Sequence, residues 1–276
     1  MSWINMRGEP APRRKAGGIA WREAGLGPPV LLIHGVGLNA DAWEPQILAL
    51  SARRRVIAVD MPGHGQSDPM PEGAGLDGYV TAIADLIDEL GLSPVPVVGH
   101  SMGALIALGL ALDHPSLVAA LVALNAVYCR DPVARSAVEV RAAQLTGGAF
   151  EVAGPIARWY PDDPHGALAR RTADWLHGVD PKGYAAAYRV FATADHAHEG
   201  RLGELACPAL FLTGVSDPNS TPAMSERMAR EAPHGSTVAL PGARHMMHLT
   251  HPAEINSTIS AFLDAAQAGE VRPGSG

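Results

Sequence analysis

Ser101 lies in a short motif whose residue types suit nucleophilic catalysis. It is the centre of Gly-His-Ser-Met-Gly, residues 99–103, which follows the apolar run 95–98 and precedes the helical pattern 104–112. A Gly-x-Ser-x-Gly sequence between a buried strand and a helix is the nucleophile elbow, a sharp turn that exposes the serine hydroxyl. We therefore predict that Ser101 is a catalytic nucleophile.

A serine hydroxyl attacks a carbonyl only when a base takes its proton and a third group holds that base in place. Downstream, Asp217 and His245 each follow an apolar run of the kind that forms a buried strand. Loops at the carboxyl ends of parallel strands gather at one edge of the sheet, so both side chains are expected beside the serine. The predicted catalytic set is Ser101, Asp217 and His245.

Other residues are alternatives for the acid and the base. His248 and His251 are rivals of His245, although both lie nearer the next helix, where a capping or solvated role is the simpler interpretation. Asp217 also suits a plain turn, because Asp-Pro-Asn favours turns in any protein. If the acid lies elsewhere, Asp195 is the first candidate.

Two backbone N–H groups are expected to stabilise the oxyanion that forms when the serine attacks. One belongs to the residue after the nucleophile, and the other to a loop between an early strand and its helix. Met102 has the first position, and Val36 in the His-Gly-Val-Gly loop at 34–37 is the expected second donor. The alternative for this loop is a simple glycine turn.

A parallel sheet must position these residues. Apolar, β-branched runs without polar alternation indicate strands buried on both faces, and they recur at 30–33, 56–59, 95–98, 121–124, 210–212 and 238–240. Helical patterns lie between them, at 43–50, 79–90, 104–112, 224–232 and 253–266. This alternation predicts an α/β fold with a mostly parallel, doubly wound sheet flanked by helices.

The segment 127–201 interrupts this alternation, because it contains no convincing strand. We interpret it as a helical lid over a core formed by 17–126 and 202–267; the alternative is a few ordinary packing helices. The ends, 1–16 and 268–276, are rich in Pro, Gly and charge and are expected to be flexible tails. The lid contains many of the aromatic residues of the chain: Trp159, Tyr160, Trp175, Tyr184, Tyr188 and Phe191.

The lid also supplies the predicted substrate contacts. Trp159, Tyr160 and Tyr188 are expected to wall an apolar pocket above the nucleophile. Arg158 is expected to meet a carboxylate where the substrate carries one, and Arg189 is a second candidate. The alternative for both arginines is a solvated surface position.

Composition and motifs limit the partners. The formal charge of -7 disfavours nucleic acid, because phosphate binding needs clustered Lys and Arg. No signal peptide and no run of about 18 apolar residues occurs, so we expect a cytoplasmic protein without membrane contact. Cys129 and Cys207 lack the spacing of a ligand motif and are expected to be structural thiols. No metal and no cofactor is expected, the partner is a small-molecule substrate, and the oligomeric state is left open.

Five stretches resemble landmarks of the α/β-hydrolase fold superfamily: LLIHGVGLNADAWEPQI, RVIAVDMPGHGQSD, VVGHSMGALIAL, LFLTGVSDPNSTP and LPGARHMMHLTHPAEINSTISAFL. The resemblance spans residues 17–266 apart from the lid, and the family's triad maps to Ser101, Asp217 and His245. Within the superfamily the chain is most similar to small bacterial esterases and enol-lactone hydrolases. The similarity to enol-lactone hydrolases depends partly on the segment YAAAYRVFATAD.

The resemblance implies a serine hydrolase that cleaves a small to medium carboxylic ester or lactone through an acyl-enzyme, with a carboxylated lactone as the narrower expectation. Ser101 excludes the haloalkane dehalogenases and epoxide hydrolases of this fold, which use aspartate at the elbow. Carbon-carbon bond hydrolases are the runner-up. The segment HGVGLNADAW of this chain only partly matches the oxyanion loop of those enzymes. Cofactor-free oxygenases and perhydrolases share the triad, and a ligand receptor similar to plant hormone receptors is the non-catalytic alternative.

Overall fold

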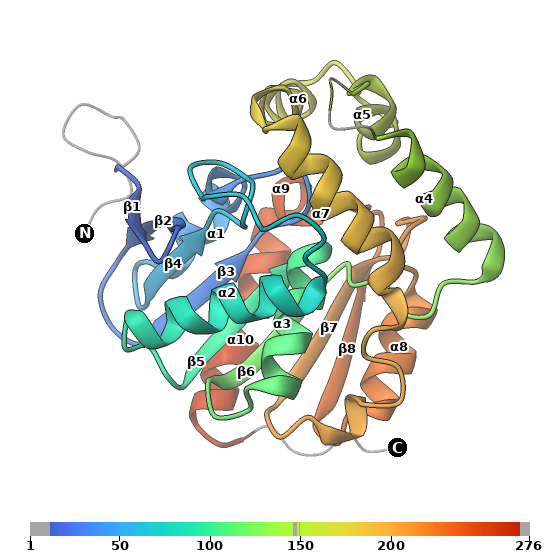
Figure 1. Cartoon of the computed structure of the whole chain (residues 1–276). Coiled ribbons are helices and arrows are strands. Elements are labelled where there is room, and N and C mark those ends of the chain that lie inside the picture. The colour runs from blue at the N-terminus through green and yellow to red at the C-terminus, as the bar shows by residue number, and fades with distance from the viewer. Residues whose placement is uncertain (1–11, 146–147, 149, 271–276) are drawn as a thin grey trace.

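The computed structural model describes residues 12–145, 148 and 150–270 (Figure 1). Within them, eight strands form one sheet in the order β1-β2-β4-β3-β5-β6-β7-β8. β2 pairs with both β1 and β4 in antiparallel fashion, and all other neighbours are parallel. The bounds are β1 Arg14–Ala16, β2 Ile19–Ala24, β3 Pro29–Ile33, β4 Arg55–Val59, β5 Val95–His100, β6 Val118–Leu124, β7 Ala209–Gly214 and β8 Gly235–Leu240.

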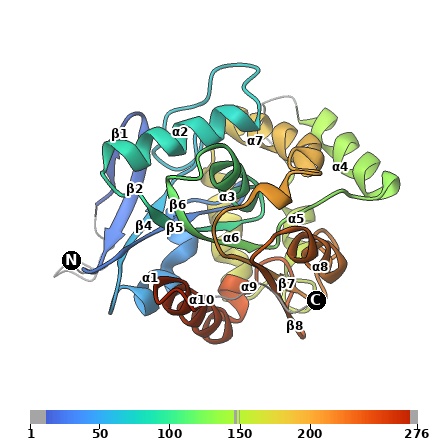
Figure 2. The same cartoon turned by 90° about the horizontal axis from the view of Figure 1, so that it is seen from below.

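Helices cover both faces of the sheet. Figure 2 shows α1 and α10 on one side and α2 and α3 on the other. The helices of this core are η1 Ala40–Trp43, α1 Glu44–Leu50, α2 Leu76–Glu89, α3 Met102–Asp113, η3 Leu202–Glu204, α8 Pro222–Glu231, α9 Met247–Thr250 and α10 Pro252–Gln267. The predicted α/β class with a mostly parallel, doubly wound sheet is therefore confirmed.

The two-sided burial explains why the strands lack polar alternation. In β3, Leu31 and Ile33 join the core on the side of α2 and α3, whereas Val30 and Leu32 join the core on the side of α1 and α10. Because successive strand residues point to opposite faces, both sets must be apolar.

No helix in the described ranges is long and apolar enough to cross a membrane.

Between β6 and η3 the described residues form helices joined by loops and turns. The helices are α4 Pro132–Gln144, α5 Ala153–Trp159, α6 Ala167–Gly178, α7 Pro181–Thr193 and η2 Ala194–His196, and no strand occurs among these described residues. The starts of α4 and α7 follow from sequence, because Asp131 and Asp180 cap them and a proline follows each aspartate. Figure 1 shows these helices grouped at one end of the sheet. We call this segment the helical insert.

Two expectations about the edges of the sheet are wrong. Arg14–Ala16, assigned to a flexible tail, pairs with Ile19–Trp21, because Gly17 and Gly18 adopt φ values of 53° and 81° that suit a tight hairpin turn. The rest of the two expected tails lies largely outside the described residues. The run 238–240 was expected to be buried on both faces, but β8 is an edge strand and its four middle residues are exposed.

Candidate active site

Ser101 occupies a strained turn between β5 and α3. Its φ of 55° and ψ of -117° are unusual for a residue with a side chain. The flanking glycines allow the turn to pack closely: a Cβ on Gly99 would lie 2.2 Å from the carbonyl oxygen of Gly103, and one on Gly103 would lie 2.2 Å from that of Ile33. The Gly-x-Ser-x-Gly spacing is thus required by the backbone contacts at this corner of the sheet.

The three residues predicted to form a triad lie together. Ser101 Oγ is 3.2 Å from His245 Nε2, and His245 Nδ1 is 2.8 Å from Asp217 Oδ2. A carboxylate only accepts hydrogen bonds, so Nδ1 carries the ring proton and Nε2 is free to accept from the serine hydroxyl. All three residues are at most 5% exposed. Asp217 follows β7, which pairs with β6, and His245 follows β8, the edge strand beyond β7.

Asp217 is held as a carboxylate by several donors. Asn125 Nδ2 and Ser220 Oγ donate to Oδ2 at 2.7 and 2.6 Å, and the backbone N–H of Asn219 donates to Oδ1 at 2.8 Å. Burial would raise the pKa of Asp217. The charge of His245 and the hydrogen bonds from His245, Ser220 and Asn219 outweigh burial and lower the pKa well below its usual value.

The rival histidines lie elsewhere. His248 is 1% exposed, its ring centroid is 5.0 Å from that of Trp43 and 4.3 Å from that of His100, and neither ring nitrogen has a hydrogen-bond partner. The expected capping or solvated role is therefore wrong for His248. His251 is partly exposed, and its Nδ1 lies 2.8 Å from Thr250 Oγ1.

The alternative acid, Asp195, is engaged at the base of the helical insert. Its Oδ2 accepts the backbone N–H of Arg130 at 2.8 Å and the guanidinium of Arg135 at 3.0 Å. It is buried among these cations, and the carboxylate that contacts His245 is Asp217. This geometry leaves Asp195 a structural role.

The loop 34–37 passes close to the elbow. A Cβ on Gly35 would lie 3.0 Å from Ser101 Cβ, and the next residue, Val36, lines the same pocket as Ser101. Met102 begins α3, so its N–H has no acceptor inside the helix. In the described part of the chain, no hydrogen bond engages the N–H of Val36 or of Met102.

Two buried histidines fix this loop. The backbone N–H of Met61 donates to His34 Nε2 at 2.9 Å, and that of Gly37 donates to His64 Nε2 at 3.0 Å. Burial lowers the pKa of His34 well below its usual value and that of His64 to about 4. Both rings are therefore neutral acceptors, and they hold the loop in register with the elbow.

A pocket opens above Ser101 and His245, with about 580 Å³ of empty space that includes the solvent at its mouth. The helical insert supplies half of the residues that line it: Val138, Arg141, Pro155, Arg158, Trp159, Tyr184, Tyr188 and Phe191. Trp159 stacks on His245, with ring centroids 5.9 Å apart. The structure thus places Trp159, Tyr188 and Arg158 among the residues that line this pocket.

Two predicted contacts lie elsewhere. Tyr160 is 7% exposed, and its hydroxyl is 2.8 Å from Thr172 Oγ1, so it packs between α5 and α6. Its expected contact with substrate is therefore wrong. Arg189 is exposed, and its guanidinium donates to the carbonyl of Leu145 outside the pocket that holds Ser101.

Sequence reasoning missed Arg141, which lines the pocket from α4. Its Nε donates to the hydroxyl of Tyr188 at 3.1 Å. Within the described residues, neither Arg141 nor Arg158 has a carboxylate within 4.0 Å of its guanidinium. Val138 lies three residues earlier on the same helical face and also lines the pocket, but neither residue was singled out from the sequence.

The family of the chain follows from a direct match. Residues 28–252 match the family model described as the alpha/beta hydrolase fold. The chain belongs to this family. Among curated members, (E)-2-((N-methylformamido)methylene)succinate hydrolase of Acinetobacter baylyi is 42% identical over 243 residues, which cover 88% of this chain and 92% of the relative. The 3-oxoadipate enol-lactonase 1 of the same organism is 28% identical over 246 residues, covering 87% of this chain and 90% of the relative.

A solved structure of a further α/β-hydrolase supports the same relationship. The crystal structure of E-2-(acetamidomethylene)succinate hydrolase superposes with a TM-score of 0.77 at 29% identity, covering 92% of this chain and 99% of that chain. All three relatives are named as hydrolases or as a lactonase. The protein is therefore an α/β-hydrolase with enol-lactonase relatives.

Proposed function

We propose that this α/β-hydrolase is a serine hydrolase that removes an acyl group from a heteroatom of a small dicarboxylate. The favoured substrate is an N-acyl aminomethylene-succinate. The observation that carries the proposal is the hydrogen-bonded series Ser101–His245–Asp217, which faces a pocket containing Arg141 and Arg158 without carboxylate partners. Two cations and aromatic walls in one pocket are suited to a small, planar, doubly charged substrate.

The names of the relatives define a common leaving group. In a 2-(amidomethylene)succinate the acylated nitrogen is bonded to a carbon–carbon double bond, and in an enol-lactone the acylated oxygen has the same position. Electron density from the departing heteroatom spreads through this double bond, so it leaves more easily than from a saturated amide or ester. This shared chemistry includes the ester or lactone cleavage expected from the sequence.

Acylation begins with the transfer of the Ser101 hydroxyl proton to His245 Nε2. The Ser101 oxygen bonds to the acyl carbon, and the carbonyl electron pair moves to its oxygen, which the N–H groups of Val36 and Met102 stabilise. Asp217 stabilises the imidazolium. When the intermediate collapses, the bond from carbon to nitrogen breaks and His245 returns its proton to the leaving nitrogen.

Deacylation repeats these steps with water. His245 removes a proton from a water molecule, whose oxygen attacks the acyl-Ser101 carbonyl. The bond to Ser101 breaks, and His245 protonates the serine oxygen. The products are a carboxylic acid and the free aminomethylene-succinate, and the enzyme is restored.

The walls of the pocket position the substrate. Arg141 donates to the hydroxyl of Tyr188 rather than to a carboxylate, so its charge is oriented without being paired. Guanidinium groups bind carboxylates through paired hydrogen bonds, which fix both the position and the angle of the carboxylate. Binding both carboxylates to arginines leaves the acyl group directed toward Ser101.

A carboxylated enol-lactone is the second candidate. The 28% identity to 3-oxoadipate enol-lactonase 1 extends over 87% of the chain and favours it. The two candidate substrates differ in the bond that breaks: the acyl group is bonded to nitrogen in the first candidate and to oxygen in the lactone. Measured kcat/KM values for the two compounds decide between them.

A substrate panel tests the proposed function. It contains 2-(acetamidomethylene)succinate, its N-methylformamido analogue, a carboxylated enol-lactone, the dimethyl esters of the two amides, a short aryl ester and a vinylogous diketone, each with wild type and Ser101→Ala. Repeated turnover of an acylated dicarboxylate, lost in Ser101→Ala, supports the proposal. Cleavage of the diketone alone indicates a carbon-carbon hydrolase, and binding without turnover indicates a receptor; either result contradicts the proposal.

A further inference from the structure

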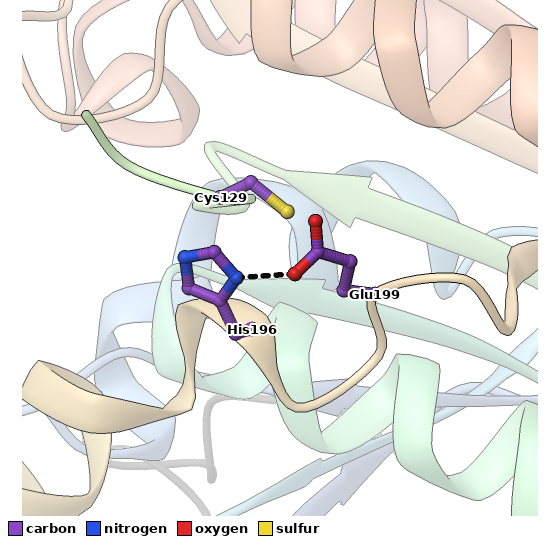
Figure 3. A group of neighbouring side chains, drawn as sticks. All are labelled: Cys129, His196 and Glu199. Atoms are coloured by element: carbon purple, nitrogen blue, oxygen red, sulfur yellow. Dashed lines mark hydrogen bonds and ion pairs between the residues drawn. The ribbon is translucent and has the colours of Figure 1, made fainter.

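Three potential metal ligands converge outside the pocket, at the base of the helical insert. Cys129 lies just after β6, where the chain enters the insert, and His196 and Glu199 lie just after α7, where the chain leaves it. Figure 3 shows the thiol, the imidazole and the carboxylate facing a common space. The proposed hydrolytic mechanism uses none of these groups.

The donor atoms are close enough for a single ion after small side-chain rotations. One ligand atom from each residue lies within 4.8 Å of the others, and His196 Nδ1 is 2.5 Å from Glu199 Oε2. Cys129 and His196 are half-buried and Glu199 is exposed, so the cluster is reachable from solvent. A thiolate, an imidazole and a carboxylate are the ligands typical of zinc.

The surroundings of the cluster orient its members. Asp195 Oδ2 is 3.6 Å from His196 Nε2, so a ring that binds an ion through Nδ1 would direct its remaining N–H toward a buried carboxylate. This carboxylate–histidine pair is the usual outer shell of a zinc-bound histidine. Arg227 contacts Glu199 Oε1 at 3.4 Å, which leaves Oε2 on the side of the cluster.

We propose that Cys129, His196 and Glu199 form a binding site for one zinc-type divalent cation, with water completing the coordination. Because the ligands come from both ends of the helical insert, the bound ion joins the entry and the exit of that insert. The backbone N–H of Cys129 already donates to the carbonyl of Asp195 at 2.8 Å, so the two segments are adjacent before any ion binds. Sequence spacing did not indicate this site, because the ligands meet only through the fold.

Cobalt titration of the tag-free, full-length protein tests the site. Cobalt(II) replaces zinc in such sites, and thiolate coordination produces a charge-transfer absorption that carboxylate or imidazole ligands alone do not give. We expect one cobalt per chain with this absorption in wild type, in Ser101→Ala and in the matched control Cys207→Ser. In Cys129→Ser the absorption is absent, and in His196→Gln and Glu199→Gln the affinity falls by more than the tenfold to hundredfold typical of outer-shell changes.

Zinc competition and thermal unfolding give readouts independent of catalysis. One equivalent of zinc should displace the cobalt and raise the unfolding temperature of wild type, since a ligand of the folded state stabilises it. Cys129→Ser should show no such rise, with its circular dichroism showing that it remains folded. The proposal is overturned if wild type lacks the thiolate absorption, or if Cys129→Ser binds both metals as tightly as wild type.

Discussion

The indole of Trp159 stacks on the imidazole of His245, with ring centroids 5.9 Å apart and ring planes 22° apart. Trp159 is the last residue of α5 in the helical insert, and His245 lies in the loop after β8 of the core. The insert therefore contacts the proposed general base directly. This contact both shields the base from water and connects the position of the insert to the orientation of the imidazole.

Removing this indole should reduce catalysis without unfolding the protein. For Trp159→Ala we expect kcat/KM to fall roughly tenfold, because aromatic pairs contribute about 0.5–1.5 kcal/mol beyond burial. Trp159→Phe should recover much of the loss. Trp175→Ala, on α6 and outside the pocket lining, is the matched control in the same steady-state assay. Equal losses in the two alanine variants would mean that the stack has no specific role.

The pair of pocket arginines should control recognition of carboxylates. Arg141→Gln and Arg158→Gln should each lower kcat/KM for the dicarboxylate roughly tenfold to hundredfold, since hydrogen bonds to charged groups contribute about 1.5–3 kcal/mol. The same substitutions should lower kcat/KM much less for the dimethyl ester, because its two ester groups carry no charge. Arg189→Gln removes an exposed cation outside this pocket and should behave like wild type. Parallel losses on diacid and diester would contradict carboxylate recognition.

The rate of catalysis should depend on the negative charge of Asp217. Asp217→Asn keeps the shape of the side chain but removes the charge that stabilises imidazolium, and we expect kcat to fall by about 10³ to 10⁴. Asp195→Asn tests the alternative acid and should retain kcat within about tenfold, because Asp195 has no contact with His245. Circular dichroism checks that both variants are folded. A larger loss of kcat in Asp195→Asn than in Asp217→Asn would reverse the assignment.

Several features of this structure were readable from sequence, and others were not. The buried strands were found because strands covered on both faces require apolar residues at every position, as in β3. The contacts of the insert depend on how each helix is rotated about its axis. Trp159 and its neighbour Tyr160 point in different directions, so one reaches His245 while the other packs against α6. Sequence pattern contains no signal that separates these two neighbours.

Buried neutral histidines should make the fold sensitive to acid. Burial lowers the pKa of His100 to about 3, that of His64 to about 4, and those of His34 and His248 well below their usual value. Below about pH 6.5 the unfolded chain therefore binds more protons than the folded chain, and stability falls as pH decreases toward the folded-state values. Urea unfolding between about pH 7.5 and pH 5 measures this loss.

His248 isolates one of these contributions, because neither of its ring nitrogens has a partner in the described structure. On acidification, the free energy of unfolding should fall less in His248→Leu than in wild type. The difference between the two proteins should grow by about 1.4 kcal/mol for each pH unit below 6.5. Its hydrolytic activity at neutral pH should stay close to that of wild type, because His248 does not line the pocket. An unchanged dependence of stability on pH would show that the unfolding of this protein is insensitive to His248 protonation.

The most direct test of the account is the mass of the enzyme during turnover. The protein is mixed with 2-(acetamidomethylene)succinate, quenched in acid within the first turnover, and analysed by intact and peptide mass spectrometry. We predict a transient acetyl adduct on Ser101. The Ser101→Ala variant should form no adduct and retain well under one tenth of the activity. Full turnover by Ser101→Ala, or an adduct on another residue that accounts for the rate, would contradict this prediction.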